Sequence, residues 1–515
     1  MATTISPAPP RRAKRRRERG PDLLKLPVIG PFLTWRHSRL VMQTPLMLIS
    51  ALILFDGFTG PSLAPRNFAT TLSWVHYRGL LVLALLMAGN LFCMGCPFMV
   101  PRKLSKWLLK PTRRWPQALR NKWLPIGGLL LILWSYEAFA LWSSPLLTAW
   151  VAVAYFVGAF VIDGLFEKAT FCKYVCPLGL FNFAYGVLSP VKISARSLDT
   201  CRDCATKDCQ QGHPGARGCE LDLFVPAMKT SMDCTLCMDC VHACPHDNIA
   251  LLVRPPATQL IPLAMASPTP AGTTRHAVAS PLTAGAARLR LPFAGRLDLA
   301  VLCVVGTGAA LVNALAMIDP GYALEARSRA LLHTTSHGLA ILPIFLLGMV
   351  IIPLAVAGGV AALVRRLADR QSTLGAVFGR LAPTYLPIGF GVWGAHYAFH
   401  FLTGALAIVP LAQSLLGEYG VTLAGPPRWG MGQVLPAEAL LPIQLLFVYG
   451  GLFGSLMVAY RTAQLRYPAA PALRRREIAV MAAVAILIAL IAVLILSQPM
   501  QMRGTFQFSG PSAGS

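Results

Sequence analysis

The chain has 515 residues, of which 55% are apolar and only 13% are charged. A soluble globular domain carries about a quarter charged residues, so this composition excludes an ordinary soluble protein and favours one that spans a membrane. The formal net charge of +25 comes from basic residues gathered in a few segments, which indicates membrane topology rather than binding to nucleic acid.

Nine apolar segments are predicted to be membrane helices, because a helix that crosses the hydrocarbon core needs about 20 mostly apolar residues. The seventh is the least well delimited, since apolar character continues almost to Leu416. In chain order the segments are 40–58, 79–99, 125–142, 147–166, 297–318, 337–363, 385–406, 440–460 and 478–496. We therefore expect an α-helical polytopic membrane protein whose ends, residues 1–39 and 498–515, form tails.

The basic residues predict the orientation of these helices. They concentrate in the N-terminal tail, after the second segment (102–122), after the sixth (365–380) and after the eighth (461–476). Cytoplasmic loops carry the excess of Lys and Arg, so the N-terminus and residues 167–296 are predicted to be cytoplasmic and the C-terminus to lie outside. The expected location is the bacterial inner membrane, with the lipid bilayer as a partner.

Residues 191–253 are predicted to form a small inserted α+β domain of the ferredoxin type. The sequence CTLCMDCVHACP places Cys234, Cys237, Cys240 and Cys244 before Pro245. This C-x2-C-x2-C-x3-C-P spacing is typical of bacterial ferredoxins with two clusters, in which the fourth cysteine ligates the other cluster. The motif therefore predicts iron–sulfur chemistry.

A second cysteine group precedes that motif with a more extended spacing. It comprises Cys201, Cys204, Cys209 and Cys219, with Glu220 in place of the usual proline. The crossed arrangement predicts one [4Fe–4S] cluster on Cys201, Cys204, Cys209 and Cys244, and another on Cys219, Cys234, Cys237 and Cys240. Zinc is the alternative, above all for the extended group, whereas the predicted cytoplasmic placement disfavours disulfides. A Pro/Ala-rich linker, 254–296, is expected to follow.

Two further cysteine pairs end the first two helical hairpins, at 40–99 and 125–176, in the sequences FCMGCPFMVPRK and FCKYVCPLGLF. Cys93 and Cys96 are spaced i, i+3, and Cys172 and Cys176 are spaced i, i+4, so each pair is predicted to share a helix face. The hypothesis is that these thiols meet at the cytoplasmic membrane edge as a third metal site or a redox-active dithiol. The alternative is that Cys-Pro only terminates two buried helices.

The C-terminal membrane domain, 297–497, contains two histidine pairs. His333 and His337 lie in HTTSH, and His396 and His400 lie in HYAFH. Ionisable residues in membrane helices are costly and suggest a task, so His337 opposite His396 or His400 is a candidate site for b-type haem, another metal or quinone. The alternative is that these side chains only form interhelical hydrogen bonds.

Over residues 40–250 the chain resembles the membrane polyferredoxin family of the NapH, NosR and CcoG types. The motifs FCMGCP, FCKYVCPLG and CTLCMDCVHACP, set along and after a four-helix membrane domain (40–190), carry this resemblance. It implies an electron carrier or oxidoreductase component that relays electrons between the quinone pool and a redox protein partner. The alternative is a factor that supplies electrons for the maturation of a respiratory metalloenzyme. The last five helices match no part of this pattern.

Overall fold

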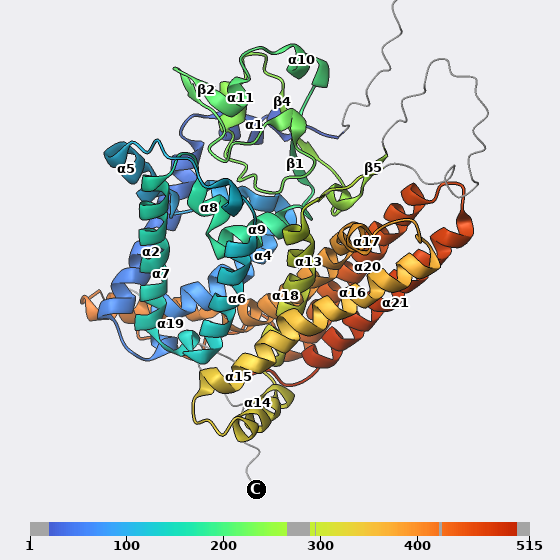
Figure 1. The fold of residues 1–515 in the computed structure, drawn as a ribbon. Helices are drawn as coiled ribbons and strands as arrows, with labels where there is room; N and C mark the ends of the chain where they lie inside the picture. Colours follow the sequence, from blue (N-terminus) through green and yellow to red (C-terminus); the bar gives the residue numbers. More distant parts are fainter. Residues whose placement is uncertain (1–19, 265–288, 294, 422–424, 502–515) are drawn as a thin grey trace, which may run out of the picture.

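The computed structural model describes residues 20–264, 289–293, 295–421 and 425–501. The described part is a bundle of long helices that carries a small cysteine-rich α+β insert at one end (Figure 1). A mostly helical membrane protein with a ferredoxin-like insert was the fold predicted from the sequence, and this prediction is confirmed.

The N-terminal half of the bundle begins with α2 and continues through two hairpins. A π-helical stretch, Thr71–His76, joins α3 to α4, and a 3-10 helix, η4 (Gly89–Met94), follows α4. The helices are α1 (Ile29–Thr34), α2 (Ser38–Thr59), α3 (Phe68–Thr70), α4 (Tyr77–Ala88), α5 (Met99–Leu109), α6 (Trp123–Ala138), α7 (Pro145–Leu165), α8 (Thr170–Tyr174) and α9 (Pro177–Gly186).

The insert is closed by two strands from its opposite ends. Strand β1 (Val191–Ala195) pairs antiparallel with β4 (Ile249–Val253), with Val191 opposite Val253 and Ala195 opposite Ile249. Between them lie α10 (Leu198–Asp203), α11 (Asp208–Gln211), the short strands β2 (Gly212–His213) and β3 (Ala216–Arg217), and α12 (Asp239–Ala243). Because β1 and β4 pair, the first and last cysteines of the insert come to the same end of the sheet.

The flanks of the insert are more ordered than a tail and a linker would be. The Pro21 carbonyl accepts a hydrogen bond from the backbone N–H of Val253, so the chain before α1 lies against β4. After β4, Leu260 is fully buried, and β5 (Leu263–Ala264) pairs with β6 (Leu289–Arg290). Residues 265–288 and 294 of the predicted linker lie outside the described residues, as do residues 1–19 and 502–515 of the predicted tails.

The C-terminal half surrounds one buried helix, α13 (Leu297–Leu315). Its other helices are α14 (Asp319–Leu331), α15 (His337–Phe345), α16 (Ile352–Leu367), α17 (Leu374–Leu381), α18 (Tyr385–Gly404), α19 (Ile408–Glu418), α20 (Leu440–Arg466) and α21 (Pro471–Leu496). One hydrophobic core joins both halves, since Leu81 and Leu180 belong to the same cluster as Leu386, Val448 and Leu496.

Within the described residues, eight helical segments are long and apolar enough to cross a membrane, one fewer than predicted. The predicted segment 125–142 forms α6, an apolar helix of only 16 residues. It ends at Ala138 because Ala140 then adopts a left-handed backbone, with φ of 44°. Each of the nine predicted segments nevertheless contains an α-helix.

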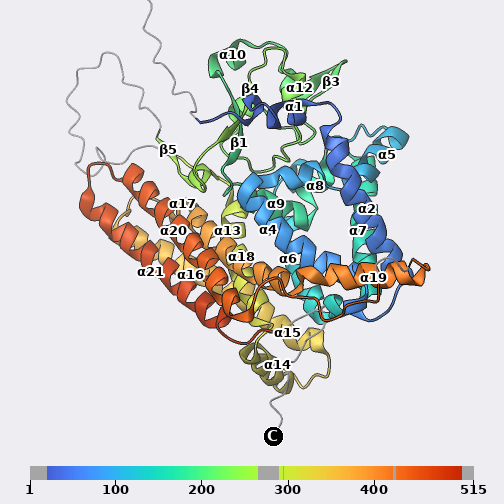
Figure 2. The ribbon, with the colours of Figure 1, turned by 180° about the vertical axis from the view of Figure 1, so that it is seen from behind.

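The boundaries predicted for the second and the seventh segments are wrong, because each helix breaks at a glycine. The segment predicted at 79–99 starts earlier, at Phe68, and its α-helix stops at Gly89, whose φ of 61° suits glycine. The seventh segment breaks at Gly404, after which α19 runs across the end of the bundle remote from the insert (Figure 2). There Leu411 packs against Phe68 and Leu72, which explains the apolar character up to Leu416.

Candidate functional site

The first set of thiols lies beside the paired strands of the insert. Cys201, Cys204, Cys209 and Cys244 line one small pocket. The Asn248 side chain donates a hydrogen bond to the Cys201 sulfur at 3.1 Å, and the backbone N–H of Asn248 donates to the Cys244 sulfur at 3.4 Å. Asn248 stands directly before β4, so the β1–β4 pairing positions both sulfurs.

Crowding of these thiols opposes their ionisation. Burial, together with negative charge on Cys244, Cys201 and Cys204, raises the pKa of Cys209 to about 11. Four thiolates can share this pocket only if a positively charged group neutralises them. The donor set therefore fits an iron–sulfur cluster, whose ligands are cysteine thiolates.

The second set comprises Cys219, Cys234, Cys237 and Cys240. Burial raises the pKa of Cys240, and charge on Cys237, Cys234 and Cys219 adds to this effect in that order. Burial and the nearby Cys219 likewise raise the pKa of Cys234 to about 12. The crossed arrangement requires these four cysteines in one set. Cys219 is then grouped with three cysteines of the compact motif, and the fourth, Cys244, belongs to the first set. Which sulfurs ligate iron stays a prediction.

The loop that carries the second set has an unusual backbone. Asp233, Leu236 and Met238 have φ of 66°, 52° and 61°, although none is a glycine. Left-handed backbone at ordinary residues costs free energy and occurs chiefly where the surroundings demand it, often at binding sites. This winding fits a loop that wraps around a bound group. Among the described residues, no cluster of His, Cys, Asp or Glu is arranged to hold a single metal ion.

The membrane-edge cysteines do not lie on continuous helices, so the predicted shared helix faces are wrong. Cys93 belongs to the 3-10 helix η4, and Cys96 lies in the turn after it. Cys172 is in α8, whereas Cys176 is the N-cap residue of α9. The physical reason is the following proline: at Pro177 it starts a new helix, where its missing N–H is not needed.

These two cysteine pairs nevertheless come together. Burial raises the pKa of the Cys176 thiol, and the thiols of Cys172, Cys96 and Cys93 are among the charges that raise it further. Asn182 donates a hydrogen bond to the Cys93 sulfur at 3.3 Å. The structure thus brings both hairpin ends to one place beneath the insert.

A buried group of charges that sequence reasoning missed joins the insert to the membrane helices. Arg39, just inside α2, contacts Glu220 at 3.0 Å and Asp239 at 3.3 Å. Arg102 of α5 also pairs with Glu220, and its guanidinium lies 3.8 Å from the Cys172 sulfur. In the sequence, the only indications of this group are two arginines near the ends of predicted helices and a glutamate, Glu220, where a proline is usual. Only the fold shows that they meet.

The electrostatics of this group favour a charged carboxylate. Burial alone would raise the pKa of Glu220, but Arg102 and then Arg39 hold it well below its usual range. Arg39 and Arg102 are almost fully buried, so the pairing compensates for the loss of water around both ions. Glu220 therefore acts as a fixed negative charge between two cations.

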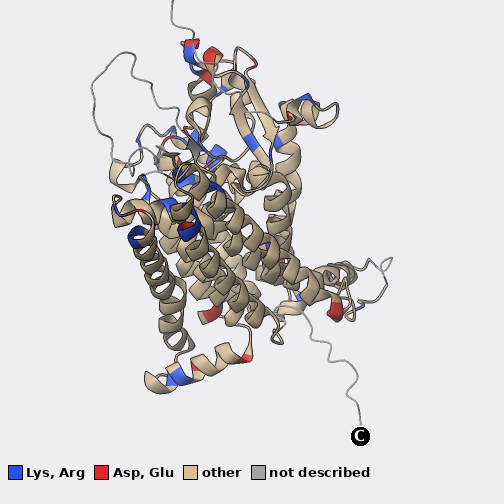
Figure 3. Cartoon of the chain, turned by 90° about the vertical axis from the view of Figure 1, so that its right-hand side faces the viewer, with Lys and Arg blue, Asp and Glu red and all other residues tan. Residues whose placement is uncertain are grey.

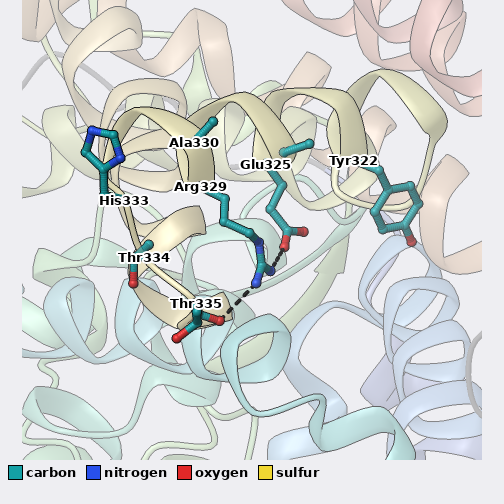
Figure 4. Close-up of a pocket in the computed structure, with 8 residues that line it drawn as sticks. Tyr322, Glu325, Arg329, Ala330, His333, Thr334 and Thr335 are labelled. Carbon is teal, nitrogen blue, oxygen red and sulfur yellow. Dashed lines mark hydrogen bonds and ion pairs between the residues drawn. The ribbon is translucent and has the colours of Figure 1, made fainter.

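The histidines fall into two separate places. His337 at the start of α15 pairs with Glu325 of α14 at 2.7 Å and is about 40% exposed at its side chain. Figure 4 shows the neighbouring pocket on α14, where Arg329 points toward Glu325 and bonds the Thr335 carbonyl, while His333 lies at the helix end. Glu325, rather than a second histidine, is the partner that the structure gives to His337.

His396 and His400 are instead buried neighbours on α18, with ring centroids 4.9 Å apart. Because both residues project from one helix, they do not supply ligands from opposite sides of a haem. The structure therefore adds no support for the haem hypothesis, which stays a prediction, as do the other metal and quinone hypotheses for these residues.

Comparison with known proteins points to the same chemistry. The chain is 26% identical over 195 residues to the methylamine utilization ferredoxin-type protein MauN of Paracoccus denitrificans (strain Pd 1222), covering 35% of this chain and 63% of MauN. It is 25% identical over 228 residues to the ferredoxin-type protein NapH of Escherichia coli (strain K12), covering 40% of this chain and 79% of NapH. YccM of the same organism, named as a proposed electron transport protein, is 33% identical over 91 residues, which are 17% of this chain and 23% of YccM.

The chain thus spans less than two thirds of MauN and less than a quarter of YccM. No protein-family model matches it, and no solved structure is found to be similar. The similarities are distant and partial, yet all three are to proteins named for ferredoxin-type or electron-transport roles. The helical bundle indicates a multi-pass membrane protein, and the cysteine-rich insert suggests iron–sulfur clusters, as the names of the ferredoxin-type relatives also do.

Proposed function

We propose that this distant relative of ferredoxin-type membrane proteins holds two [4Fe–4S] clusters and relays electrons between a membrane quinone or quinol and a redox protein partner. The observation that carries the proposal is the division of eight insert cysteines into two sets of four, one around a common pocket. A cubane supplies one-electron chemistry, in which the charge is shared over several iron and sulfur atoms.

Under this proposal, residues of the chain hold the clusters, stabilise their charge and anchor the insert. Cys201, Cys204, Cys209 and Cys244 hold one cluster, and Cys219, Cys234, Cys237 and Cys240 hold the other. Asn248 donates hydrogen bonds to two sulfurs of the first set, which stabilises negative charge there. Arg39 and Arg102 anchor the insert on the membrane helices, so both clusters stay close to the bilayer.

The proposed orientation places the insert and the N-terminus in the cytoplasm of a bacterium, with the inner membrane as the location. The supporting observation is the distribution of basic residues, most of which lie on the insert and on the helix ends nearest to it (Figure 3). The positive-inside bias assigns that end to the cytoplasm, where thiols stay reduced.

The test is low-temperature EPR with iron and sulfide quantification on protein purified without oxygen. Cys201→Ser and Cys234→Ser are expected to remove the signal of one cluster each, and not the same one. Cys303→Ser, at a buried cysteine of α13 that belongs to neither set, is the matched control and should leave both signals unchanged. A preparation free of iron and acid-labile sulfide would overturn the proposal.

The electron source needs a separate measurement. The purified protein, reduced by a quinol in a stopped-flow experiment, is expected to show bleaching of the iron–sulfur absorbance. Reduction by dithionite without reduction by quinol would contradict the quinone part of the proposal. Loss of a metalloenzyme's cofactor in a deletion strain would then favour the role in maturation.

A further inference from the structure

Three of the four cysteines at the membrane edge have a hydrogen-bond donor beside the sulfur. Asn182 donates to the Cys93 sulfur at 3.3 Å, and the backbone N–H of Gly179 donates to the Cys176 sulfur at 3.1 Å. The guanidinium of Arg102 lies 3.8 Å from the Cys172 sulfur. A cysteine that only fills apolar space has no need of an N–H donor, whereas a ligand thiolate is stabilised by one.

This thiol set is also connected to the second set of the insert. The Asn90 side chain, on the same 3-10 helix as Cys93, donates a hydrogen bond to the Cys234 carbonyl at 2.8 Å. Arg102, besides its contact with Cys172, pairs with Glu220, the residue next to Cys219. Two independent contacts therefore place the membrane-edge thiols beside the proposed ligands Cys219 and Cys234.

The geometry points to a third iron–sulfur centre, held by Cys93, Cys96, Cys172 and Cys176 between the bilayer and the insert. This inference deepens the proposed function and rests on it, because the new centre connects a membrane donor to the clusters of the insert. All four cysteines are free thiols from two separate hairpins, so they can converge on one group without a disulfide. A group of several irons suits them better than a single ion, for which no site is arranged in the described part of the chain.

The proposed electron transfer balances with a membrane quinol as the reductant. The centre held by the Cys93 set would give one electron to the cluster held by the Cys234 set, so the first would be oxidised by one electron and the second reduced by one, and no bond would form or break in this transfer. A quinol would supply two electrons, one for each of two such transfers, and would release two protons as it becomes a quinone.

Iron content of the wild-type protein tests the inference directly. Two [4Fe–4S] clusters account for about eight irons per chain, and a third centre raises this to about ten or twelve for two or four additional irons. We expect the higher value in protein whose two ferredoxin-type signals are fully developed by spin quantification. About eight irons with both signals intact would overturn the third centre and leave the proposed function standing. No iron at all would overturn both.

Substitution then locates the additional iron. Cys96→Ser and Cys172→Ser are chosen because both side chains are only half-buried, so their replacement disturbs packing least. Each should lower the iron content by two to about four per chain and leave the two ferredoxin-type signals, with Cys303→Ser as the control that loses no iron. Unchanged iron in both variants would refute the inference. So would one zinc per chain that is lost in them, or ready alkylation of these thiols in the untreated protein.

Discussion

At the scale of single residues, the position of Cys244 shows how the two cysteine sets of the insert are divided. It belongs in sequence to the compact motif, yet the structure places it in a pocket with Cys201, Cys204 and Cys209. The crossed arrangement of the motif predicts this placement. The pairing of β1 with β4 makes it possible, because it brings the end of the motif to the start of the insert.

The crossed arrangement predicts which cysteines ligate the same cluster. Cys244→Ser should alter the same EPR signal as Cys201→Ser, and Cys219→Ser should alter the same signal as Cys234→Ser. The physical reason is that a cluster's g-values depend on its own four ligands. Paired EPR spectra of the four variants are the measurement. If Cys244→Ser instead changed the signal that Cys234→Ser changes, the crossed assignment would be wrong.

Arg102 is predicted to affect both stability and redox potential. Its buried guanidinium pairs with Glu220 and faces Cys172, so Arg102→Gln leaves a buried carboxylate without its nearest cation. Breaking such a pair costs about 3–5 kcal/mol. Because a reduced cluster carries an extra negative charge, loss of the cation should also lower the cluster potential.

Thermal unfolding in detergent and an EPR-monitored redox titration measure the two effects. Arg114→Gln is the matched control, since the Arg114–Glu167 pair is exposed and worth at most about 1 kcal/mol. Equal behaviour of the two variants would mean that the Arg102 contacts contribute neither to anchoring nor to potential.

At the scale of elements, the most extensive packing between two helices of the described residues is that of α18 against α20. A Cβ atom built at Gly391 would stand 2.5 Å from the Phe447 carbonyl oxygen, and one at Gly451 would stand 2.7 Å from the Pro387 carbonyl oxygen. Small residues of this kind let membrane helices approach, since packing rather than water expulsion drives their association. The glycines were visible in the sequence, but their facing partners were not.

Gly451→Leu should therefore destabilise the C-terminal half. The added side chain cannot enter the contact without separating α18 from α20, and overpacking of this kind costs about 1–3 kcal/mol or more. Gly450→Leu on the same helix is the control, because nothing lies within 4 Å of its Cβ position. A lower melting temperature for the first variant alone, measured by light scattering or differential fluorescence in detergent, is the expected result. Similar melting temperatures would contradict the close contact.

At the scale of the whole molecule, the insert and the membrane helices form one unit. Arg39 and Arg102 hold the insert from α2 and α5, and Asn90 adds a hydrogen bond from η4. The two halves of the bundle in turn share one hydrophobic core and the contact of α19 with α3. This arrangement keeps the two cysteine sets of the insert and the membrane-edge cysteines near one end of the bundle.

The orientation of the whole molecule is open to a direct test. An alkaline phosphatase moiety fused after Ser515 should be active, and green fluorescent protein at the same place should be dark, because the C-terminus is predicted to lie outside. Green fluorescent protein fused before Met1 should be fluorescent. The reverse pattern would place the insert outside the cytoplasm, where disulfides form and iron–sulfur clusters are not expected.

Sequence by itself determined the features that depend on local order along the chain. Hydropathy over a window of about 20 residues located every long helix, and cysteine spacing within a few residues identified the ferredoxin-type motif. The crossed membership of the two cysteine sets also comes from the spacing, and it stays a prediction.

Only the tertiary structure decided which distant residues meet. Arg39 and Glu220 lie far apart in sequence, and their 3.0 Å contact follows from how the insert sits on α2. The break at Gly89 and the pairing of His337 with Glu325 likewise depend on neighbours that no periodicity specifies. The physical reason is that hydropathy and spacing act within one segment, whereas packing and buried charge are settled between segments that the fold brings together.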